Sequence, residues 1–447
     1  MKNPTRRELA AATAFSLVPR HVLGKGQTPP SDKLIIAGIG IGGVGKAYLK
    51  GVSTENIAFL CDVDDALAAK VFATYPKAKR YKDYRRLLDA EKSIDAVVIG
   101  TPDHSHAAIT LAALGLGKNV YCAKPLTRTI AECRAVARAA RKAGVATQMS
   151  VQSCGSDKAV STAEWVRSGA IGSVREVHVW SNRPVWPQGV HRPKTGQPVP
   201  ATLDWNLWLG PAPFRPYHRA YHPFTFRGWY DFGTGALGDM GCHTFHVIVR
   251  ALDLGAPTAV SATRSNVVRL RRPDEEKNWS GSISVKFPES FPHASIVTWS
   301  FPARKRLPPV RLTWYDGDLK PPPPPELDPG QQLPSSGILF LGQKGTILSG
   351  FSGGPRLLPE SRNAGFKPPK KTMQRTEDHY GEFVAACKGG PSPMCEFGFG
   401  TQLTELTLLG DLAVRTRKPL RWNATTGTTG DPEADRYLEE PARPGWI

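Results

Sequence analysis

The chain has 447 residues, too many for one ordinary hydrophobic core, so two domains are expected. Its 40% hydrophobic content is ample for buried cores. The sequence contains no run of 18 or more apolar residues, so no membrane-spanning helix is expected. The formal net charge of +19 comes from scattered basic residues without a long Lys/Arg block, so we expect solubility and attraction to acidic polymers such as envelope polysaccharide, and no nucleic-acid partner.

The first residues have the pattern of an export signal. Arg6 and Arg7 form a twin arginine ahead of a modest apolar stretch over residues 9–18, and Pro19 follows. This pattern is similar to a twin-arginine signal, which carries folded proteins across the bacterial inner membrane. A chance pair is the alternative, because no clear cleavage site follows. We assign residues 1–32 to an export signal and linker, and expect a periplasmic or otherwise exported bacterial protein.

A short apolar strand beginning at residue 34 runs straight into a glycine-rich turn. Gly40, Gly42 and Gly45 fit the pattern G-x-G-x-x-G, with Gly43 between them. Such a turn lets the backbone approach a pyrophosphate closely and aims the next helix N-terminus at its negative charge. The segment therefore predicts a dinucleotide-binding turn.

Asp62 supports this prediction and indicates which dinucleotide is bound. It ends a second apolar strand, residues 57–61, and lies 22 residues after Gly40, where a carboxylate would hydrogen-bond the adenosine ribose. The carboxylate would repel a 2′-phosphate, and residues 63–65 offer no Arg to receive one, so NAD is favoured over NADP. The alternative is an ordinary turn with Asp62 as a helix cap.

Between residues 33 and 150, short apolar strands alternate with Ala-rich helical patterns. The strands are expected at 34–37, 57–61, 96–99, 119–122 and 145–149, with a prominent helix over 130–143. This alternation predicts an α/β Rossmann domain with a parallel, doubly wound sheet, whose ligands bind beyond the carboxyl ends of the strands. Two loops at those ends, carrying Thr101, Pro102 and His104 in one and Lys124 in the other, should face the cofactor.

The pattern changes after residue 150, which predicts a second, α+β domain over residues 151–447. Strands on a mostly antiparallel sheet are expected at 174–180, 282–287, 294–301, 310–315 and 337–340, with helices at 159–168, 376–387 and 401–416. From residue 374 onward the chain forms a helical return segment and tail. The five consecutive prolines from Pro321 to Pro325 indicate an extended spacer or loop.

Three side chains have the chemistry of an acid–base site. Asp239 and His243 are four residues apart at the expected start of a helix, so they share one face, where a carboxylate can raise the basicity of an imidazole. Lys124 follows a buried strand and could polarise a substrate hydroxyl or carbonyl. A surface pair and a surface lysine are the alternatives.

The segment 203–231 interleaves aromatic side chains with His and Arg, including Arg227 and Trp229. Aromatic faces beside polar donors suit a carbohydrate, whereas a loop held together by its own aromatics is an equal alternative. The chain also has seven cysteines without a C-x-x-C pair, so neither a disulfide framework nor a metal site is expected.

These motifs together resemble the Gfo/Idh/MocA family, the relatives of glucose–fructose oxidoreductase and inositol dehydrogenase, over nearly all of residues 33–447. The resemblance rests on the glycine turn, Thr101-Pro-Asp-His104, Ala123-Lys-Pro125, and Asp239 with His243. It implies an NAD(P)-binding Rossmann domain and a second domain with a large open sheet that shapes a sugar site and an oligomer interface, most simply of a dimer or tetramer.

The resemblance also implies roles for individual residues. Lys124 and His243 would assist proton transfer during hydride transfer, Asp239 would position substrate or His243, and Gln152, Arg227 and Trp229 are further candidates for the substrate site. The family usually has Glu-Lys-Pro, where this chain has Ala123 before Lys124, and it often has Asp where this chain has His246. Both departures put the ordinary chemistry in doubt.

The resulting expectation is an exported NAD-dependent oxidoreductase acting on a sugar, polyol or glycoside. Because a periplasm has no ready pool of NAD, the cofactor should stay bound and be restored in each redox-neutral turnover. NAD-assisted glycoside cleavage by a hydrolase or lyase is one alternative. A cofactor-binding protein without turnover is the other, since fold does not imply function.

Overall fold

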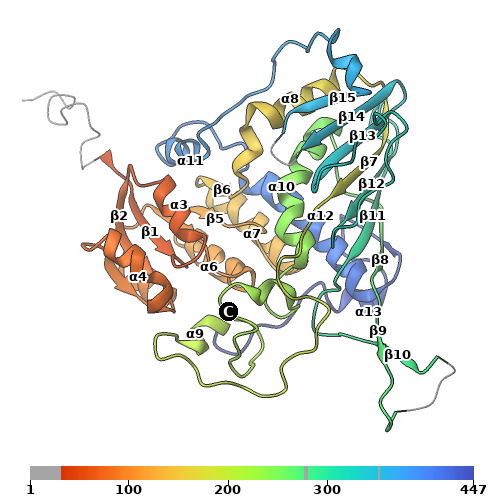
Figure 1. Cartoon of the computed structure of the whole chain (residues 1–447). Coiled ribbons are helices and arrows are strands. Elements are labelled where there is room, and N and C mark those ends of the chain that lie inside the picture. Colours follow the sequence, from red (N-terminus) through yellow and green to blue (C-terminus); the bar gives the residue numbers. More distant parts are fainter. Residues whose placement is uncertain (1–31, 276–279, 351–352, 447) are drawn as a thin grey trace, which may run out of the picture.

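The computed structural model describes residues 32–275, 280–350 and 353–446 (Figure 1). The predicted twin-arginine pattern lies outside these residues. Within them, no helix is long and apolar enough to cross a membrane.

The first domain is the predicted parallel, doubly wound sheet. Six strands lie in the order β3-β2-β1-β4-β5-β6, and every neighbouring pair is parallel. The strands are β1 (Ile35–Ile39), β2 (Asn56–Cys61), β3 (Lys79–Tyr81), β4 (Ala96–Ile99), β5 (Asn119–Cys122) and β6 (Thr147–Met149). The strand order reverses between β1 and β4, which is the switch point where such sheets bind ligands.

Helices cover this sheet. They are α3 (Gly45–Gly51), α4 (Asp65–Thr74), α5 (Tyr84–Ala90), α6 (Asp103–Gly115) and α7 (Ile130–Ala143). Three of the five described here, α4, α5 and α7, begin at a side-chain cap. Helix α7 matches the predicted bounds because both of its ends are encoded locally. Thr129 and Glu132 form a reciprocal capping box at its start, and Gly144 adopts φ 64° at its end.

The second domain is built on a mixed eight-stranded sheet, in the order β15-β14-β13-β7-β12-β11-β8-β16. Strands β7 and β12 are parallel, and the other neighbouring pairs are antiparallel. The strands are β7 (Val174–Trp180), β8 (Ala259–Arg264), β11 (Ser295–Phe301), β12 (Val310–Tyr315), β13 (Gly337–Gly342), β14 (Gly345–Gly350), β15 (Pro355–Leu358) and β16 (Leu420–Arg421). The α+β prediction is confirmed.

The strand predicted at 282–287 lies outside the eight-stranded sheet. Strand β10 (Ser282–Val285) pairs with β9 (Val267–Leu270) in a separate two-stranded ribbon that projects from the molecule in Figure 1. Leu270 on this ribbon is 82% exposed. The alternating pattern identified a strand, but it could not show that the strand leaves the main sheet.

Three long helices fill the space between the two sheets: α8 (Asp157–Arg167), α10 (Gly235–Leu252) and α12 (Phe397–Thr416) (Figure 1). Helix α11 (His379–Cys387) returns to the Rossmann sheet, where Phe383 joins the apolar cluster around Tyr48 and Tyr121. The short elements are α9 (Trp205–Leu209), α13 (Pro432–Asp435) and the 3-10 turns η2 (Gln152–Gly155), η3 (Thr225–Gly228) and η4 (Glu360–Asn363). Pro321–Pro325 belong to a loop, as predicted.

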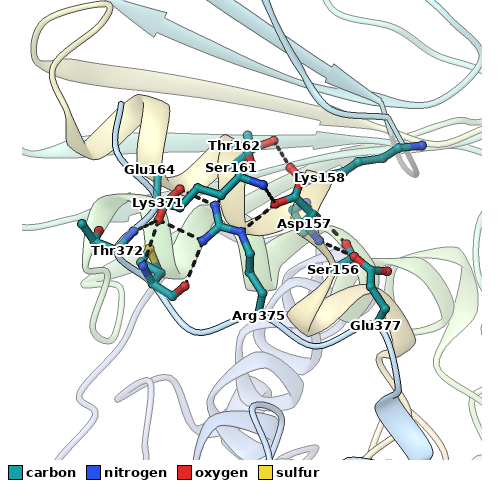
Figure 2. Close-up of polar contacts among 12 residues, drawn as sticks. Ser156, Asp157, Lys158, Ser161, Thr162, Glu164, Lys371, Thr372, Arg375 and Glu377 are labelled. Carbon is teal, nitrogen blue, oxygen red and sulfur yellow. Dashed lines mark hydrogen bonds and ion pairs between the residues drawn. The ribbon is translucent and has the colours of Figure 1, made fainter. Parts of the chain in front are cut away.

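The extended segment that carries Arg375 and leads to α11, here called the crossover, is joined to α8 by ion pairs and hydrogen bonds (Figure 2). Arg375 donates to both Asp157 and Glu164 on α8, and Glu164 also accepts the backbone N–H groups of Thr372 and Met373 at 2.7 and 2.9 Å. The side chain of Glu164 is only 5% exposed. The crossover is therefore fixed by a buried carboxylate and not by regular secondary structure.

Candidate functional site

A cleft of about 620 Å³ opens where the Rossmann strands end beside the second domain. One wall comes from the glycine turn and the loops after β2, β3 and β4, and the other from the aromatic segment around α9 and η3. The lining includes Gly40, Gly42, Gly43, Asp62, Val63, Lys82, Asp83, Tyr84, Thr101, Pro102, Trp208, Gly210, His222, Phe224, Phe226, Arg227 and Trp446. Its position is the one predicted for a dinucleotide.

The glycine turn has the close backbone packing that the motif predicts. Gly40 has φ 75°, and a Cβ added there would lie 2.5 Å from the backbone nitrogen of Thr101. A Cβ added at Gly45 would lie 2.1 Å from the carbonyl oxygen of Gly40. Larger side chains would therefore disrupt the turn, and the open backbone beside it fits a pyrophosphate.

Asp62 lies in the cleft at the end of β2 and does not cap the next helix. Asp64 is the N-cap of α4, where its carboxylate accepts from Ala66. The Asp62 carboxylate accepts the backbone N–H groups of Gly42 at 2.8 Å and Asp64 at 3.0 Å. Burial raises its pKa, against the opposing effect of these hydrogen bonds. An acceptor at this point fits an adenosine ribose.

A polar cluster around Asp239 adjoins the cleft through Arg227, whereas Asp239 and Lys124 themselves lie outside the cleft lining. Its Oδ1 accepts from Lys124 Nζ at 2.6 Å and from Arg227 Nε at 3.1 Å, and Lys124 also donates to the Asp239 carbonyl at 2.5 Å. Burial would raise the pKa of Asp239, but the charges of Lys124 and Arg227 hold it well below its usual value. The site therefore holds two cations around one ionised carboxylate.

His243 lies one turn after Asp239 on α10, as predicted. The charge of Asp239 acts in the predicted direction and raises the pKa of His243, but two larger effects oppose it. Burial and the neighbouring Lys124 ammonium lower the pKa of His243 to about 3, outweighing the opposing charge of Asp239. His243 is consequently a neutral imidazole at physiological pH.

The residues predicted in the loop after β4 lie in two different places, some in the cleft and one in the contact with the aromatic segment. Thr101 and Pro102 line the cleft. His104 lies outside its lining and is 1% exposed, with its ring nitrogens 3.2 and 2.9 Å from the carbonyl oxygens of Phe232 and Trp208. Burial lowers its pKa to about 4. In this structure His104 joins α6 to the aromatic segment.

The candidate substrate-binding residues Arg227, Trp229 and Gln152 lie in three different places. Arg227 lines the cleft and reaches Asp239. Trp229 is 2% exposed, and its indole N–H donates to the Ala220 carbonyl within a cluster of aromatic side chains. Gln152 is exposed on η2, with its amide nitrogen 3.5 Å from the Tyr380 hydroxyl. Much of the aromatic segment is thus a loop held together by its own aromatics.

The two departures from the family pattern occupy buried positions. Ala123 is 4% exposed and packs in the apolar cluster with Tyr121. His246 is 1% exposed, and its Nε2 lies 3.3 Å from the Ser153 hydroxyl.

Several cleft residues were not predicted. His222 lines the cleft, and its Nε2 lies 2.9 Å from the Asp64 carboxylate, which joins the aromatic segment to the Rossmann domain. The aromatic segment contained a weak signal for this contact, whereas Trp446 lies about 360 residues from its neighbour Arg85 and had none.

The side chains that could bind a metal ion do not cluster within the described residues. We find no group of three or more His, Cys, Asp and Glu side chains there that could hold a metal ion. All seven cysteines lie within the described ranges as free thiols.

Comparisons with known proteins agree with this architecture. Residues 34–151 match the Gfo/Idh/MocA oxidoreductase family model described as an NAD-binding Rossmann fold, and residues 173–263 match its C-terminal alpha/beta domain. Inositol 2-dehydrogenase of Salmonella paratyphi B is 34% identical over 111 residues, or 24% of this chain and 33% of that protein. Levoglucosan dehydrogenase of Pseudarthrobacter phenanthrenivorans is 26% identical over 249 residues, 52% of this chain and 54% of that protein.

The match with inositol 2-dehydrogenase thus spans about a third of that relative's length. A solved structure extends the comparison to the whole fold. The WlbA dehydrogenase from Bordetella pertussis, in complex with NADH and UDP-GlcNAcA, superposes with a TM-score of 0.59 over 88% of this chain and 99% of that chain, at 16% identity. The two family matches fall on the two observed domains in the same order, so both domains are similar to those of the Gfo/Idh/MocA oxidoreductase family.

Proposed function

We propose that this protein is an NAD-dependent oxidoreductase acting on a CH–OH group of a sugar, polyol or glycoside. The observation that carries the proposal is the continuity of the cleft. It runs from the glycine turn and Asp62 to Arg227, which touches the same carboxylate oxygen as Lys124. The matched dehydrogenases named for inositol and levoglucosan support a carbohydrate substrate.

The glycine turn and Asp62 would hold the dinucleotide, which when bound supplies the hydride acceptor. Asp239 positions the Lys124 ammonium, whose Nζ–H would donate to the substrate oxygen and stabilise its developing negative charge. The neutral His243 ring would accept the hydroxyl proton. A weak base suffices, because a hydroxyl becomes strongly acidic as its carbon loses hydride.

The charge around the ribose position supports NAD as the cofactor. Asp62 lines that end of the cleft, the Asp64 carboxylate lies 2.9 Å from the cleft residue His222, and residues 63–65 contain no Arg. A 2′-phosphate would meet this negative charge. Lys82 is the cation that lines the cleft nearby, and it pairs with Asp65 at 2.9 Å.

We further propose that the cofactor stays bound through a redox-neutral turnover in an exported protein that functions as a homo-oligomer. The twin-arginine pattern supports export, and an exported enzyme could not recycle released NADH. Two alternatives concern the net reaction and the role of Ala123. Bound NAD could serve an oxidation–cleavage–reduction cycle on glycosides, or Ala123 could mark a protein that binds the cofactor without turnover.

The cofactor assignment can be tested on the purified protein. Denaturation should release NAD(H) in excess over NADP(H), and calorimetry on stripped protein should show tighter binding of NAD. Asp62→Ala should weaken NAD binding and reduce the preference for NAD, because it removes both a ribose acceptor and a repulsive charge. Asp89→Ala, which removes a carboxylate that is 92% exposed, is the matched control and should leave both affinities unchanged. Equal NAD/NADP ratios in wild type and Asp62→Ala would refute the role of Asp62.

A further inference from the structure

Residues 437–446, which we call the strap, are attached to the molecule next to the cleft. The Leu438 carbonyl accepts from the backbone N–H of Ala131 at 2.9 Å. Glu440 pairs with Arg415 at 2.6 Å and with the buried Arg128. The N-terminal end of the strap is therefore fixed to α7 and α12, so the residues after Glu440 start from a fixed position.

Beyond Glu440 the strap is held by the aromatic wall of the cleft. The backbone N–H of Arg443 donates to the Pro211 carbonyl at 3.0 Å. Its guanidinium donates to the carbonyl oxygens of Gly210 and Asn206 at 3.1 and 2.8 Å, and to the Asn206 side chain at 2.7 Å. In Figure 1 the end marked C lies beside α9, which is this wall.

The next residues of the strap contact the opposite, Rossmann wall. Arg85 on α5 donates to the Gly445 carbonyl at 3.0 Å, and its guanidinium lies 4.0 Å from the centre of the Trp446 ring. Arg443 lies on the same ring at 5.2 Å. Such cation–π contacts stabilise the position of the ring. The strap thus joins the two walls, and the ring of Trp446 is 8% exposed.

Trp446 lines the adenosine end of the cleft. In a Rossmann domain the carboxylate after β2 marks the ribose, so the cleft beyond Asp62 and away from the glycine turn receives the adenine. The lining there comes from Asp83 and Tyr84 after β3, and Arg85, which holds Trp446, is the next residue.

We propose that Trp446 is a cofactor-binding residue that contacts the adenine, and that the strap slows release of the dinucleotide. The inference rests on the dinucleotide binding proposed above and adds the means by which an oxidoreductase could retain its cofactor. Release requires the ring of Trp446 to leave its place beside Arg85, because the strap connects both walls of the cleft.

The test is the dissociation rate of NADH. Protein loaded with NADH is mixed with excess NAD, and the loss of protein-sensitised NADH fluorescence is followed by stopped flow. Trp446→Ala should accelerate dissociation by about 5- to 100-fold, the range expected for loss of one base–aromatic contact. Trp446→Phe should recover part of the effect. Arg85→Gln, which leaves the cleft lining intact, should also accelerate release.

Two matched variants provide the controls. Trp422 is 6% exposed with Arg134 5.2 Å from its ring centre, and it lies outside the cleft, so Trp422→Ala should leave the rate within twofold of wild type. Arg86→Gln removes the neighbouring charge on α5, and it should also leave the dissociation rate within twofold of wild type. Binding of ADP-ribose, which lacks nicotinamide, should weaken in Trp446→Ala by a factor similar to that for NADH.

The outcomes separate the two proposals. If wild type binds neither NADH nor ADP-ribose, dinucleotide binding and the strap proposal both fall. If wild type binds NADH and the rates of Trp446→Ala, Trp446→Phe and Arg85→Gln all stay within twofold of it, the strap proposal alone is refuted. Should Trp446→Ala fail to fold, Trp446→Phe and Arg85→Gln decide the question.

Discussion

At the scale of single residues, Asp239 organises the polar cluster that adjoins the cleft through Arg227. The sequence paired it with His243, because a four-residue spacing puts both on one helix face. The structure shows its carboxylate bound by Lys124, 115 positions earlier in the chain, and by Arg227, 12 positions earlier. One carboxylate between two cations leaves a positive charge at the site, which suits an oxygen that becomes negative during reaction.

We predict that Lys124→Ala and His243→Ala each lower kcat/KM for the sugar substrate by about 10²–10⁴, the usual scale for a proton-transfer group. Because the pKa of His243 is about 3, it stays neutral between pH 5 and 8. The ratio of wild-type to His243→Ala activity should therefore be constant over that range. Steady-state kinetics across pH measures both quantities. His293→Ala, which removes an exposed imidazole, serves as the control, and a His243→Ala value within threefold of wild type would contradict the assignment.

At the scale of elements, prediction from sequence succeeded where local signals suffice. Helix α7 has its capping box and its Gly144, and β4, β5, β7 and β12 are apolar or alternating runs with clear ends. Strand β8 was missed because its residues are half exposed and lack a strict alternation. The contacts of His222 with Asp64 and of Trp446 with Arg85 join residues more than 150 positions apart, so a local pattern could not indicate which residues form each pair.

The crossover held by Arg375 yields a stability prediction. Arg375→Ala removes the charged partner of buried Glu164 and should lower the free energy of unfolding by about 1–3 kcal/mol. Lys371→Ala breaks an ion pair whose side chains are 63% and 46% exposed, and should change stability by less than about 0.5 kcal/mol. Urea unfolding of both variants measures the difference. Equal effects of the two substitutions would show that burial of Glu164 does not matter.

The same variants have a defined pH dependence. The hydrogen bond from Arg375 lowers the pKa of Glu164 to about 2, below its value of 4.5 in an unfolded chain. This carboxylate therefore stabilises the fold above pH 4.5, and its contribution is lost as the pH falls toward 2. The destabilisation caused by Arg375→Ala should accordingly shrink as unfolding is measured from pH 6 down to pH 3.

At the scale of the whole molecule, the glycine turn and Asp62 of the first domain share one cleft with Arg227 of the second domain. Helix α11 returns the chain to the Rossmann sheet after the second sheet is complete, and the strap then connects both walls. In the strap proposal, these contacts slow the release of a bound dinucleotide. Slow release would suit an enzyme that regenerates its cofactor in place.

We accordingly predict that turnover is redox-neutral. Reduced nicotinamide absorbs in the near ultraviolet and the oxidised form does not, so the cycle can be followed on the purified holoprotein without added NAD. A sugar or glycoside substrate should produce a transient signal of at most one equivalent per subunit, because hydride moves to the bound cofactor and then returns to an intermediate. The signal should decay as product accumulates over many turnovers, which mass spectrometry of the products would count. Steady production of free NADH, with turnover only when NAD is supplied, would instead identify an ordinary dehydrogenase, and would remove the reason for expecting a retained cofactor in an exported protein.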